Sequence, residues 1–212
     1  MIRKLLGCAM AALFVAPVCP AVATQVVLED FTTVRGSFGE VRDAAHGVPV
    51  GAPTGDTTQY VSAPRCGAFT FDAGPATATE GMIEFYTIPL TLPADCTAFS
   101  WQCMAPVGFT YSVEVEDTSL WLHHASPRFA QISDGKWQAS SVSISKLSPP
   151  LAPGASVANV YIRVYGGGNG SRVPLAGVAR FDDFIFKTPS AAGEAANARL
   201  TGFQTSVPFK QP

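Results

Sequence analysis

Two adjacent acidic residues stand between phenylalanines near the end of the patterned part of the sequence. Asp182 and Asp183 lie in the segment Phe-Asp-Asp-Phe-Ile-Phe at 181–186. In a regular strand neighbouring side chains point to opposite faces, so Asp182 would share its face with Phe184 and Phe186. An ionised carboxylate is costly to bury without partners. Whichever acid faces the core therefore needs backbone N–H donors, a basic side chain or a metal ion.

A second group of residues suits the recognition of a sugar. Tyr161, Arg163 and Tyr165 alternate with Val160 and Ile162, so the aliphatic side chains are predicted inside and the rings and guanidinium outside. Sugars offer C–H faces to aromatic rings and hydroxyl groups to polar side chains. Alternation in other segments adds outward residues, and the predicted ligand-binding set is Tyr86, Gln102, Trp121, His123, Tyr161, Arg163 and Tyr165. The alternative is that a loop or the C-terminal tail covers this face.

Catalysis would need a different constellation. Glu84 and Glu114 are predicted to face outward from their strands, and glycoside hydrolases use two carboxylates across a cleft. The sequence contains no Gly-x-Ser-x-Gly motif and no arginine, histidine and tyrosine cluster typical of a lyase. No catalytic residue is therefore assigned, and an enzyme remains an alternative.

The segments that must position these residues are short and alternate with a period of two. Glycine, proline, aspartate, asparagine and serine separate them, which is typical of an all-β sandwich or barrel. The predicted strands lie near 25–31, 58–63, 67–72, 81–88, 97–104, 109–116, 119–124, 128–132, 137–145, 158–165 and 178–187.

The ends of the chain differ in character from this middle part. Residues 1–23 resemble a secretory signal peptide, with an early positive charge, an apolar stretch and a small-residue cleavage site at Ala21-Val22-Ala23. We expect one domain over 24–187 and a tail over 188–212 that contains at most a short helix. The chain is thus expected to be bacterial and secreted or periplasmic, without a transmembrane segment.

The charge of the sequence narrows the classes of binding partner, and its cysteines limit the possible disulfide bridges. The 212 residues carry a net charge of -2 and only 14% charged residues, with no basic block, so nucleic acid is not an expected partner. Cys66, Cys96 and Cys103 follow the predicted signal peptide. A strand from Cys96 to Cys103 would hold their Cα atoms about 23 Å apart, too far for a disulfide. If a bridge forms, it joins Cys66 to one of the other two.

Several segments together resemble the galactose-binding-like β-jelly rolls, the fold of many carbohydrate-binding modules. The final strand around Asp182 and Asp183, after NVYIRVYG and a glycine-rich connection, is similar to the last strand of that fold. The early VVLEDF and the later DGKWQASSVSI match its first strand and its turn-tryptophan-strand segment. The resemblance covers roughly residues 25–187 and implies a two-sheet antiparallel β-sandwich.

The resemblance also implies a metal site and a function. In such modules the first acid of the last strand binds a structural calcium ion, which implies Asp182 as a ligand here with help from Asp30 or Glu29. Backbone N–H donors or an arginine are the alternative partners of Asp182. The implied function is noncatalytic binding of a polysaccharide or other glycan. A structural or interaction protein of the cell envelope is the alternative, followed by a polysaccharide lyase or glycoside hydrolase; neither the glycan nor the oligomeric state follows from the sequence.

Overall fold

The alternating segments form two antiparallel sheets, which confirms the all-β prediction and the two-sheet sandwich. The computed structural model describes residues 24–32, 38–43, 48, 50–73, 80–166 and 176–189. The predicted signal peptide and nearly all of the predicted tail lie outside these described residues. Within them no helix is long and apolar enough to cross a bilayer.

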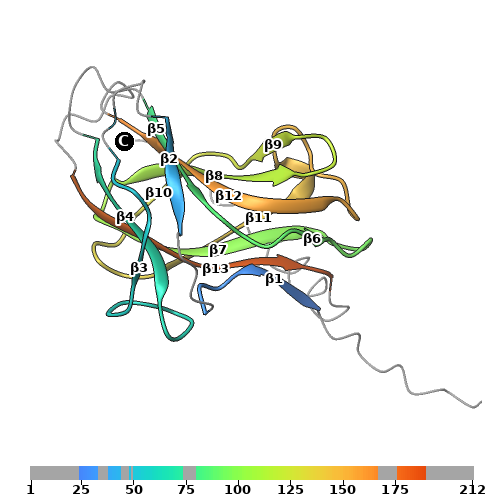
Figure 1. The fold of residues 1–212 in the computed structure, drawn as a ribbon, viewed down its shortest axis with the longest axis horizontal. Helices are drawn as coiled ribbons and strands as arrows, with labels where there is room; N and C mark the ends of the chain where they lie inside the picture. Colours follow the sequence, from blue (N-terminus) through green and yellow to red (C-terminus); the bar gives the residue numbers. More distant parts are fainter. Residues whose placement is uncertain are drawn as a thin grey trace, which may run out of the picture. The chain divides into compact units, whose positions relative to one another are not determined.

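Sheet A holds six strands in the order β11-β7-β13-β4-β3, with β1 paired to β13. Their bounds are β1 (Gln25–Glu29), β3 (Thr54–Asp56), β4 (Cys66–Asp72), β7 (Ala98–Met104), β11 (Gln138–Ser143) and β13 (Ala176–Lys187). The last strand of the described residues, β13, is therefore central in this sheet, where β4 and β7 flank it (Figure 1).

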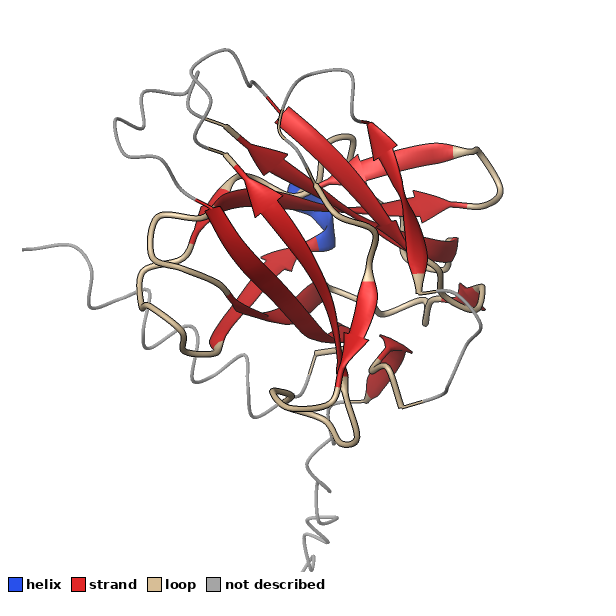
Figure 2. Ribbon diagram, turned by 60° about the vertical axis from the view of Figure 1, so that its left-hand side comes forward, coloured by secondary structure: helices blue, strands red, loops and turns tan. Residues whose placement is uncertain are grey.

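Sheet B holds seven strands in the order β10-β8-β12-β5-β2, with β6 paired to β12 and β9 to β8. Their bounds are β2 (Gly39–Asp43), β5 (Glu80–Phe85), β6 (Leu90–Thr91), β8 (Thr110–Asp117), β9 (Leu122–Ala125), β10 (Phe129–Ala130) and β12 (Ser156–Tyr165). A single 3₁₀ turn, η1 (Ile144–Lys146), is the one helical element among the described residues (Figure 2).

Aromatic side chains fill the space between the two sheets. Phe69, Phe99 and Phe181 of sheet A are fully buried with Phe85 and Phe109, which point inward from sheet B. Their rings meet in stacked and tilted pairs, such as Phe69 on Phe181 with centroids 6.1 Å apart. The inward residues of β12, Val160, Ile162 and Val164, are also fully buried, as the alternation predicts.

A β-bulge in β13 explains the acid pair between phenylalanines. Asp182 lies opposite Gln102, and the register with β7 shifts before Ile185, with Asp183 at a φ of 53°. The inserted residue breaks the alternation, so Phe181, Phe184 and Phe186 all face the core. The predicted face of Asp182 is therefore wrong: it points outward with Gln102 rather than inward with Phe184.

Most predicted strands are present, and the exceptions are one predicted strand that is a loop and three short strands that are not predicted. The predicted strand over 58–63 is wrong, because these residues form a loop after β3. The short strands β2, β3 and β6 are absent from the prediction; they have five, three and two residues, too few for alternation to stand out.

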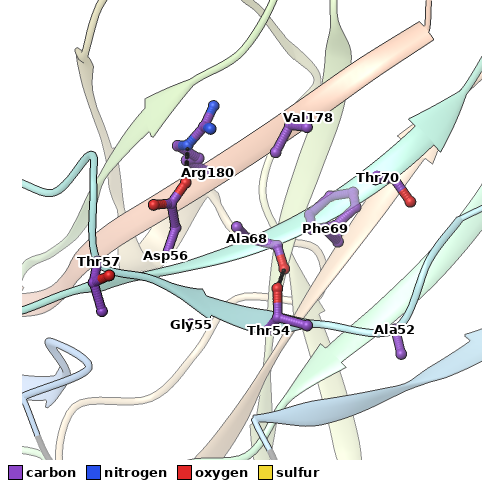
Figure 3. A pocket seen from close by; sticks show the side chains of 10 residues that line it. All are labelled: Ala52, Thr54, Gly55, Asp56, Thr57, Ala68, Phe69, Thr70, Val178 and Arg180. Atoms are coloured by element: carbon purple, nitrogen blue, oxygen red, sulfur yellow. Dashed lines mark hydrogen bonds and ion pairs between the residues drawn. The ribbon is translucent and has the colours of Figure 1, made fainter.

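The loop after β3 folds onto the outer face of sheet A. The backbone N–H groups of Val61 and Ser62 donate to Oδ2 of Asp182 at 2.8 and 2.9 Å, and the Ser62 hydroxyl donates to Asp183. Beside this loop, β3, β4 and β13 border a hollow in the same outer face (Figure 3).

Candidate functional site

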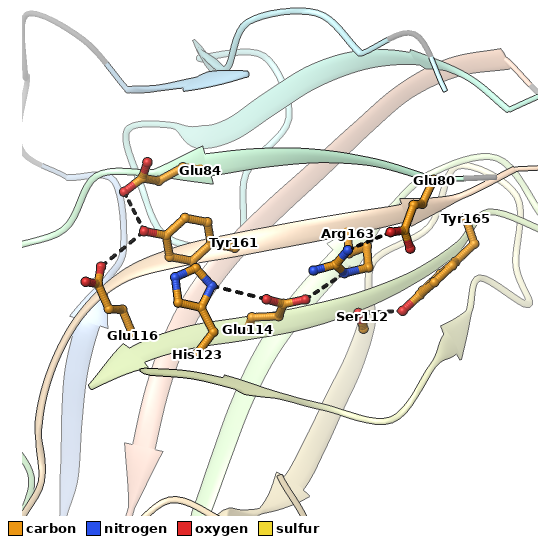
Figure 4. A network of polar contacts seen from close by, with 9 residues as sticks. All are labelled: Glu80, Glu84, Ser112, Glu114, Glu116, His123, Tyr161, Arg163 and Tyr165. Atoms are coloured by element: carbon orange, nitrogen blue, oxygen red, sulfur yellow. Dashed lines mark hydrogen bonds and ion pairs between the residues drawn. The ribbon is translucent and has the colours of Figure 1, made fainter. Parts of the chain in front are cut away.

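The outer face of sheet B carries a network of polar and aromatic side chains (Figure 4). It is built from alternate residues of β12, β8 and β5, with one residue of β9. Register places Tyr161 opposite both Glu84 and Glu114, and Arg163 opposite Ser112. The members of this outer-face network are Glu80, Glu84, Ser112, Glu114, Glu116, His123, Tyr161, Arg163 and Tyr165.

Tyr161 lies at the buried end of the outer-face network. Its hydroxyl is 3.0 Å from Oε1 of Glu84 and 3.1 Å from Oε2 of Glu116. Burial, followed by the two neighbouring carboxylates, raises the pKa of Tyr161, so the phenol stays protonated and serves as a donor. The His123 ring covers it, with centroids 4.2 Å apart.

Arg163 joins the middle of the network through two carboxylates. Its Nε donates to Oε1 of Glu114 at 2.8 Å, and its Nη1 donates to Oε1 of Glu80 at 2.9 Å. Burial by itself lowers the pKa of Arg163, but Glu114 and then Glu80 outweigh it and raise the pKa. The second oxygen of Glu114 lies 3.3 Å from Nδ1 of His123. The guanidinium and the imidazole are thereby fixed on one carboxylate.

Tyr165 forms the opposite, more open end. Its hydroxyl is 3.1 Å from the Ser112 hydroxyl, and the exposed Arg128 guanidinium lies 3.8 Å above its ring. The ring therefore has its hydroxyl anchored and a cation over its face. From Tyr161 to Tyr165 the strand advances about 13 Å, which gives the network an elongated form.

Of the seven predicted ligand-binding residues, four belong to this network. Tyr161 points outward, as alternation predicts, although the ring is buried beneath His123. Arg163, Tyr165 and His123 remain partly exposed. The structure thus brings together the residues of β12 and β9 on one face.

The other three predicted residues lie elsewhere. Gln102 is on β7 of sheet A, so it faces away from the outer face of sheet B. Trp121 occupies the turn between β8 and β9 at a φ of 52° and is 80% exposed. Tyr86 follows the end of β5 and is half-buried. Neither Gln102 nor Trp121 is a member of the outer-face network.

Sequence reasoning missed several members of the network as ligand-binding residues. Glu116 continues the outward alternation of Ser112 and Glu114 along β8, so the signal was present in the spacing. Glu80 lies at the start of β5, opposite Tyr165. The position of Arg128 over Tyr165 depends on a contact between distant segments, which no local pattern reveals.

The carboxylates implied as calcium ligands are engaged with the backbone. Oδ1 of Asp182 accepts the N–H of Asp183, Oε1 of Glu29 accepts that of Phe31, and Oδ1 of Asp30 accepts that of Thr32. Over the described residues, no three His, Cys, Asp or Glu side chains are grouped so as to hold a metal ion. Calcium binding by Asp182 with Asp30 or Glu29 stays a prediction that rests on the resemblance.

Asp182 gives a prediction about stability and pH. Burial, with a contribution from Asp183, raises its pKa from 3.8 to about 6 against the opposing effect of its backbone donors. A raised pKa in the folded state means that this group stabilises the fold below about pH 4 and loses that contribution as the pH rises through about 6. Urea unfolding between pH 4 and 7 measures the unfolding free energy of wild type minus that of Asp182→Asn. We expect this difference to fall by up to about 3 kcal/mol as the pH rises.

The Asp182→Asn variant supplies its own control, because both proteins share every other titrating group. If the stability curves of the two proteins ran parallel over this pH range, they would contradict a raised pKa of Asp182 in the folded state. The absolute loss of stability in the variant is a separate quantity, since an amide oxygen can accept from Val61 and Ser62 while its NH₂ group cannot accept from the backbone N–H of Asp183.

The three cysteines of the domain are free and buried. No bridge joins Cys66 to Cys96 or Cys103, the pairing that the sequence left open. Burial, followed by the charge of Asp182, raises the pKa of the Cys66 thiol to about 12, and burial likewise raises that of Cys103. These thiols are therefore poor nucleophiles.

The two facing antiparallel sheets define a β-jelly roll of the type found in carbohydrate-binding modules. A family 11 carbohydrate-binding module of the cellulase Lic26A-Cel5E of Clostridium thermocellum superposes with a TM-score of 0.54 at 8% identity, over 80% of this chain and 97% of that one. A family 11 module from the same organism, solved with a β-1,3-1,4-mixed-linked tetrasaccharide, gives 0.51 at 9% identity, over 78% and 96%. No protein-family model and no curated protein matches the sequence.

Proposed function

We propose that the protein binds a polysaccharide without cleaving it, on the outer face of sheet B. The observation that carries the proposal is the outer-face network, in which Tyr165, Arg163 and His123 lie partly exposed along one face. Rings that can stack on a sugar stand there beside groups that can bond to its hydroxyls, and protein contacts hold each of them in place.

The immobilisation of these side chains supports binding. Arg163 is held by Glu114 and Glu80, and the Tyr165 hydroxyl contacts Ser112. Side chains that are already fixed lose little conformational entropy when a ligand binds. The polar groups of these side chains can thus replace their hydrogen bonds to water with hydrogen bonds to sugar hydroxyls.

The ligand class is taken from proteins with the same fold. One family 11 module of this fold was solved with a β-1,3-1,4-mixed-linked tetrasaccharide. The length of the network along β12 suits an extended chain rather than a single sugar. We therefore propose a linear glucan of mixed linkage as the first ligand to test.

The state of the carboxylates supports a noncatalytic role. Glu114 is shared between Arg163 and His123, and Glu84 is fully buried beside the Tyr161 hydroxyl. A hydrolase needs one carboxyl group near the leaving oxygen and a second near the sugar ring. Neither glutamate is open to a substrate in this arrangement.

Residues 1–23 resemble a secretory signal peptide. We therefore further propose that the domain acts as a secreted or periplasmic protein.

A role as an interaction protein of the cell envelope is the second candidate, favoured by the β8–β9 turn. Leu120 and Trp121 are 67% and 80% exposed there, and Leu122 beside them is also exposed. Large apolar side chains that lie together at a surface often mark an interface. Trp121→Ala separates the two candidates. It should leave glycan binding on sheet B unchanged, whereas it should weaken an interface made through this turn.

Affinity electrophoresis through mixed-linkage β-glucan tests the proposed function. We expect the gel to retard the wild-type domain, and Tyr165→Ala to weaken retention about tenfold or more, since aromatic anchors carry much of the energy of an interface. Gln102→Ala is the matched control, because Gln102 lies on the other sheet. Equal migration with and without glucan, or equal retention of Tyr165→Ala and Gln102→Ala, would reject the site.

A further inference from the structure

The outer face of sheet A has a hollow of about 390 Å³ at β3, β4 and β13 (Figure 3). The volume lies within the range of small-molecule sites. Its lining combines one ion pair with hydroxyl and methyl groups: Ala52, Thr54, Gly55, Asp56, Thr57, Ala68, Phe69, Thr70, Val178 and Arg180. We propose that this hollow is a second binding site, separate from the outer-face network, for an uncharged sugar residue with adjacent hydroxyl groups.

Arg180 supplies the donors. Its Nε donates to Oδ2 of Asp56 at 2.7 Å, and its side chain is 22% exposed. A guanidinium has five N–H groups, and in the contacts among the described residues the terminal nitrogens of Arg180 donate to no protein acceptor. Arg163 of sheet B, by contrast, uses both Nε and Nη1 on carboxylates. The planar pair of terminal nitrogens on Arg180 is therefore left for a ligand at the hollow.

Asp56 fixes this guanidinium in place. Its other oxygen accepts the backbone N–H of Thr58 at 2.7 Å and the Thr58 hydroxyl at 2.6 Å. Burial by itself raises the pKa of Asp56, but the bonds from Thr58 and Arg180 outweigh it and hold the pKa at about 2. The carboxylate is charged and accepts three hydrogen bonds from the protein, so it orients Arg180.

The remaining lining complements a sugar. The Thr54 hydroxyl bonds to the carbonyl of Ala68, while Thr70 and Thr57 are exposed and carry hydroxyl groups at the rim. The side chains of Ala68 and Val178 are small and apolar, so they can pack against C–H groups. Thr70 also lines a neighbouring hollow of about 380 Å³ beside Val50 and Gly51, which leaves room for a further sugar unit.

The surrounding charges favour an uncharged ligand over an acidic one. Asp182 and Asp183 follow Arg180 on the same strand, and Asp182 faces outward as Arg180 does. Asp56, Asp182 and Arg180 all act electrostatically on the Cys66 thiol, which places these charges close together. The positive charge of Arg180 is already paired with Asp56, and Asp182 adds a further carboxyl group nearby, so a uronate or sulfated sugar would gain little attraction here.

Amide chemical shifts of the ¹⁵N-labelled domain test this second site, with methyl β-D-glucopyranoside, methyl β-D-galactopyranoside and D-glucuronate as separate probes. We expect at least one neutral glycoside to shift Thr54, Thr70 and Arg180, with weaker or no effect from glucuronate. Thr70→Val should lower the affinity about fivefold through loss of one hydrogen bond. Ala52→Trp, at the exposed rim, should fill the hollow and abolish the shifts.

Tyr165→Ala is the control, because it alters the outer-face network and leaves the hollow unchanged. Shifts that persist in Tyr165→Ala and disappear in Ala52→Trp would support the second site even if no glucan binds to sheet B. The absence of shifts at β3 and β4 with both glycosides would overturn it, whatever the outcome of the glucan test. Tighter binding of glucuronate than of the glycosides would overturn the assignment of an uncharged ligand.

Discussion

Replacement of Phe184 by alanine is expected to lower the free energy of unfolding by about 3–5 kcal/mol. The Phe184 ring is fully buried and packs against Phe31, Phe85, Phe99 and Phe181 in the core. Removal of the ring leaves a cavity that the two rigid sheets close only in part. Urea denaturation of the two proteins at one pH measures the difference.

Ile185→Ala is the matched control, one residue along the same strand. The bulge at Asp183 leaves Ile185 half-buried on the outer face, opposite Ser100, so we expect a loss below about 1.5 kcal/mol. Regular alternation through Asp182 and Asp183 would place Phe184 and Ile185 on opposite faces as well, but would also turn Phe181 away from Phe184. A larger loss for Ile185→Ala than for Phe184→Ala would contradict the core position of Phe184 and the outer position of Ile185.

Arg163→Met should weaken glucan binding by more than tenfold and lower the unfolding free energy by about 2–3 kcal/mol. Methionine keeps the apolar stem but removes the charge from Glu114, whose side chain is only 5% exposed. Loss of one partner of a fully buried ion pair costs about 3–5 kcal/mol, and the 26% exposure of Arg163 reduces that figure. Affinity electrophoresis and urea denaturation measure the two effects.

Glu80→Gln is the comparison for this variant. It alters the more exposed end of the same network, where the Glu80 side chain is 30% exposed, and should cost below about 1 kcal/mol. An Arg163→Met protein with unchanged stability would show that the Glu114 pair contributes nothing, and unchanged retention would remove Arg163 from the site.

Alternation predicts the core faces of most strands, because a strand turns successive side chains to opposite sides. Val160, Ile162 and Val164 on β12 and Trp101 on β7 are buried as expected. Local pattern fails at β13, since the positive φ of Asp183 depends on contacts with Ser62, 121 positions earlier. The loop at 58–63 fails for the same reason: its N–H groups satisfy a distant carboxylate rather than a neighbouring strand.

The composition of the site could be predicted only in part. Spacing turns Tyr161 and Arg163 outward, but outward does not mean exposed. Tyr161 is covered because Glu84, Glu116 and His123 reach it from three other strands. Gln102 shares the outward parity of these residues yet lies on the other sheet, because the pattern of one strand does not state which sheet the strand joins.

Chemical-shift mapping with a mixed-linkage β-glucan tetrasaccharide tests the central proposal most directly. We predict that the largest perturbations in the ¹⁵N-labelled domain will fall on the backbone of Tyr161 to Tyr165, on His123 and on Arg128. Saturable shifts confined to these residues would place the ligand on the outer face of sheet B. Perturbations centred on β4 and β13 alone, or none up to millimolar ligand, would contradict the account.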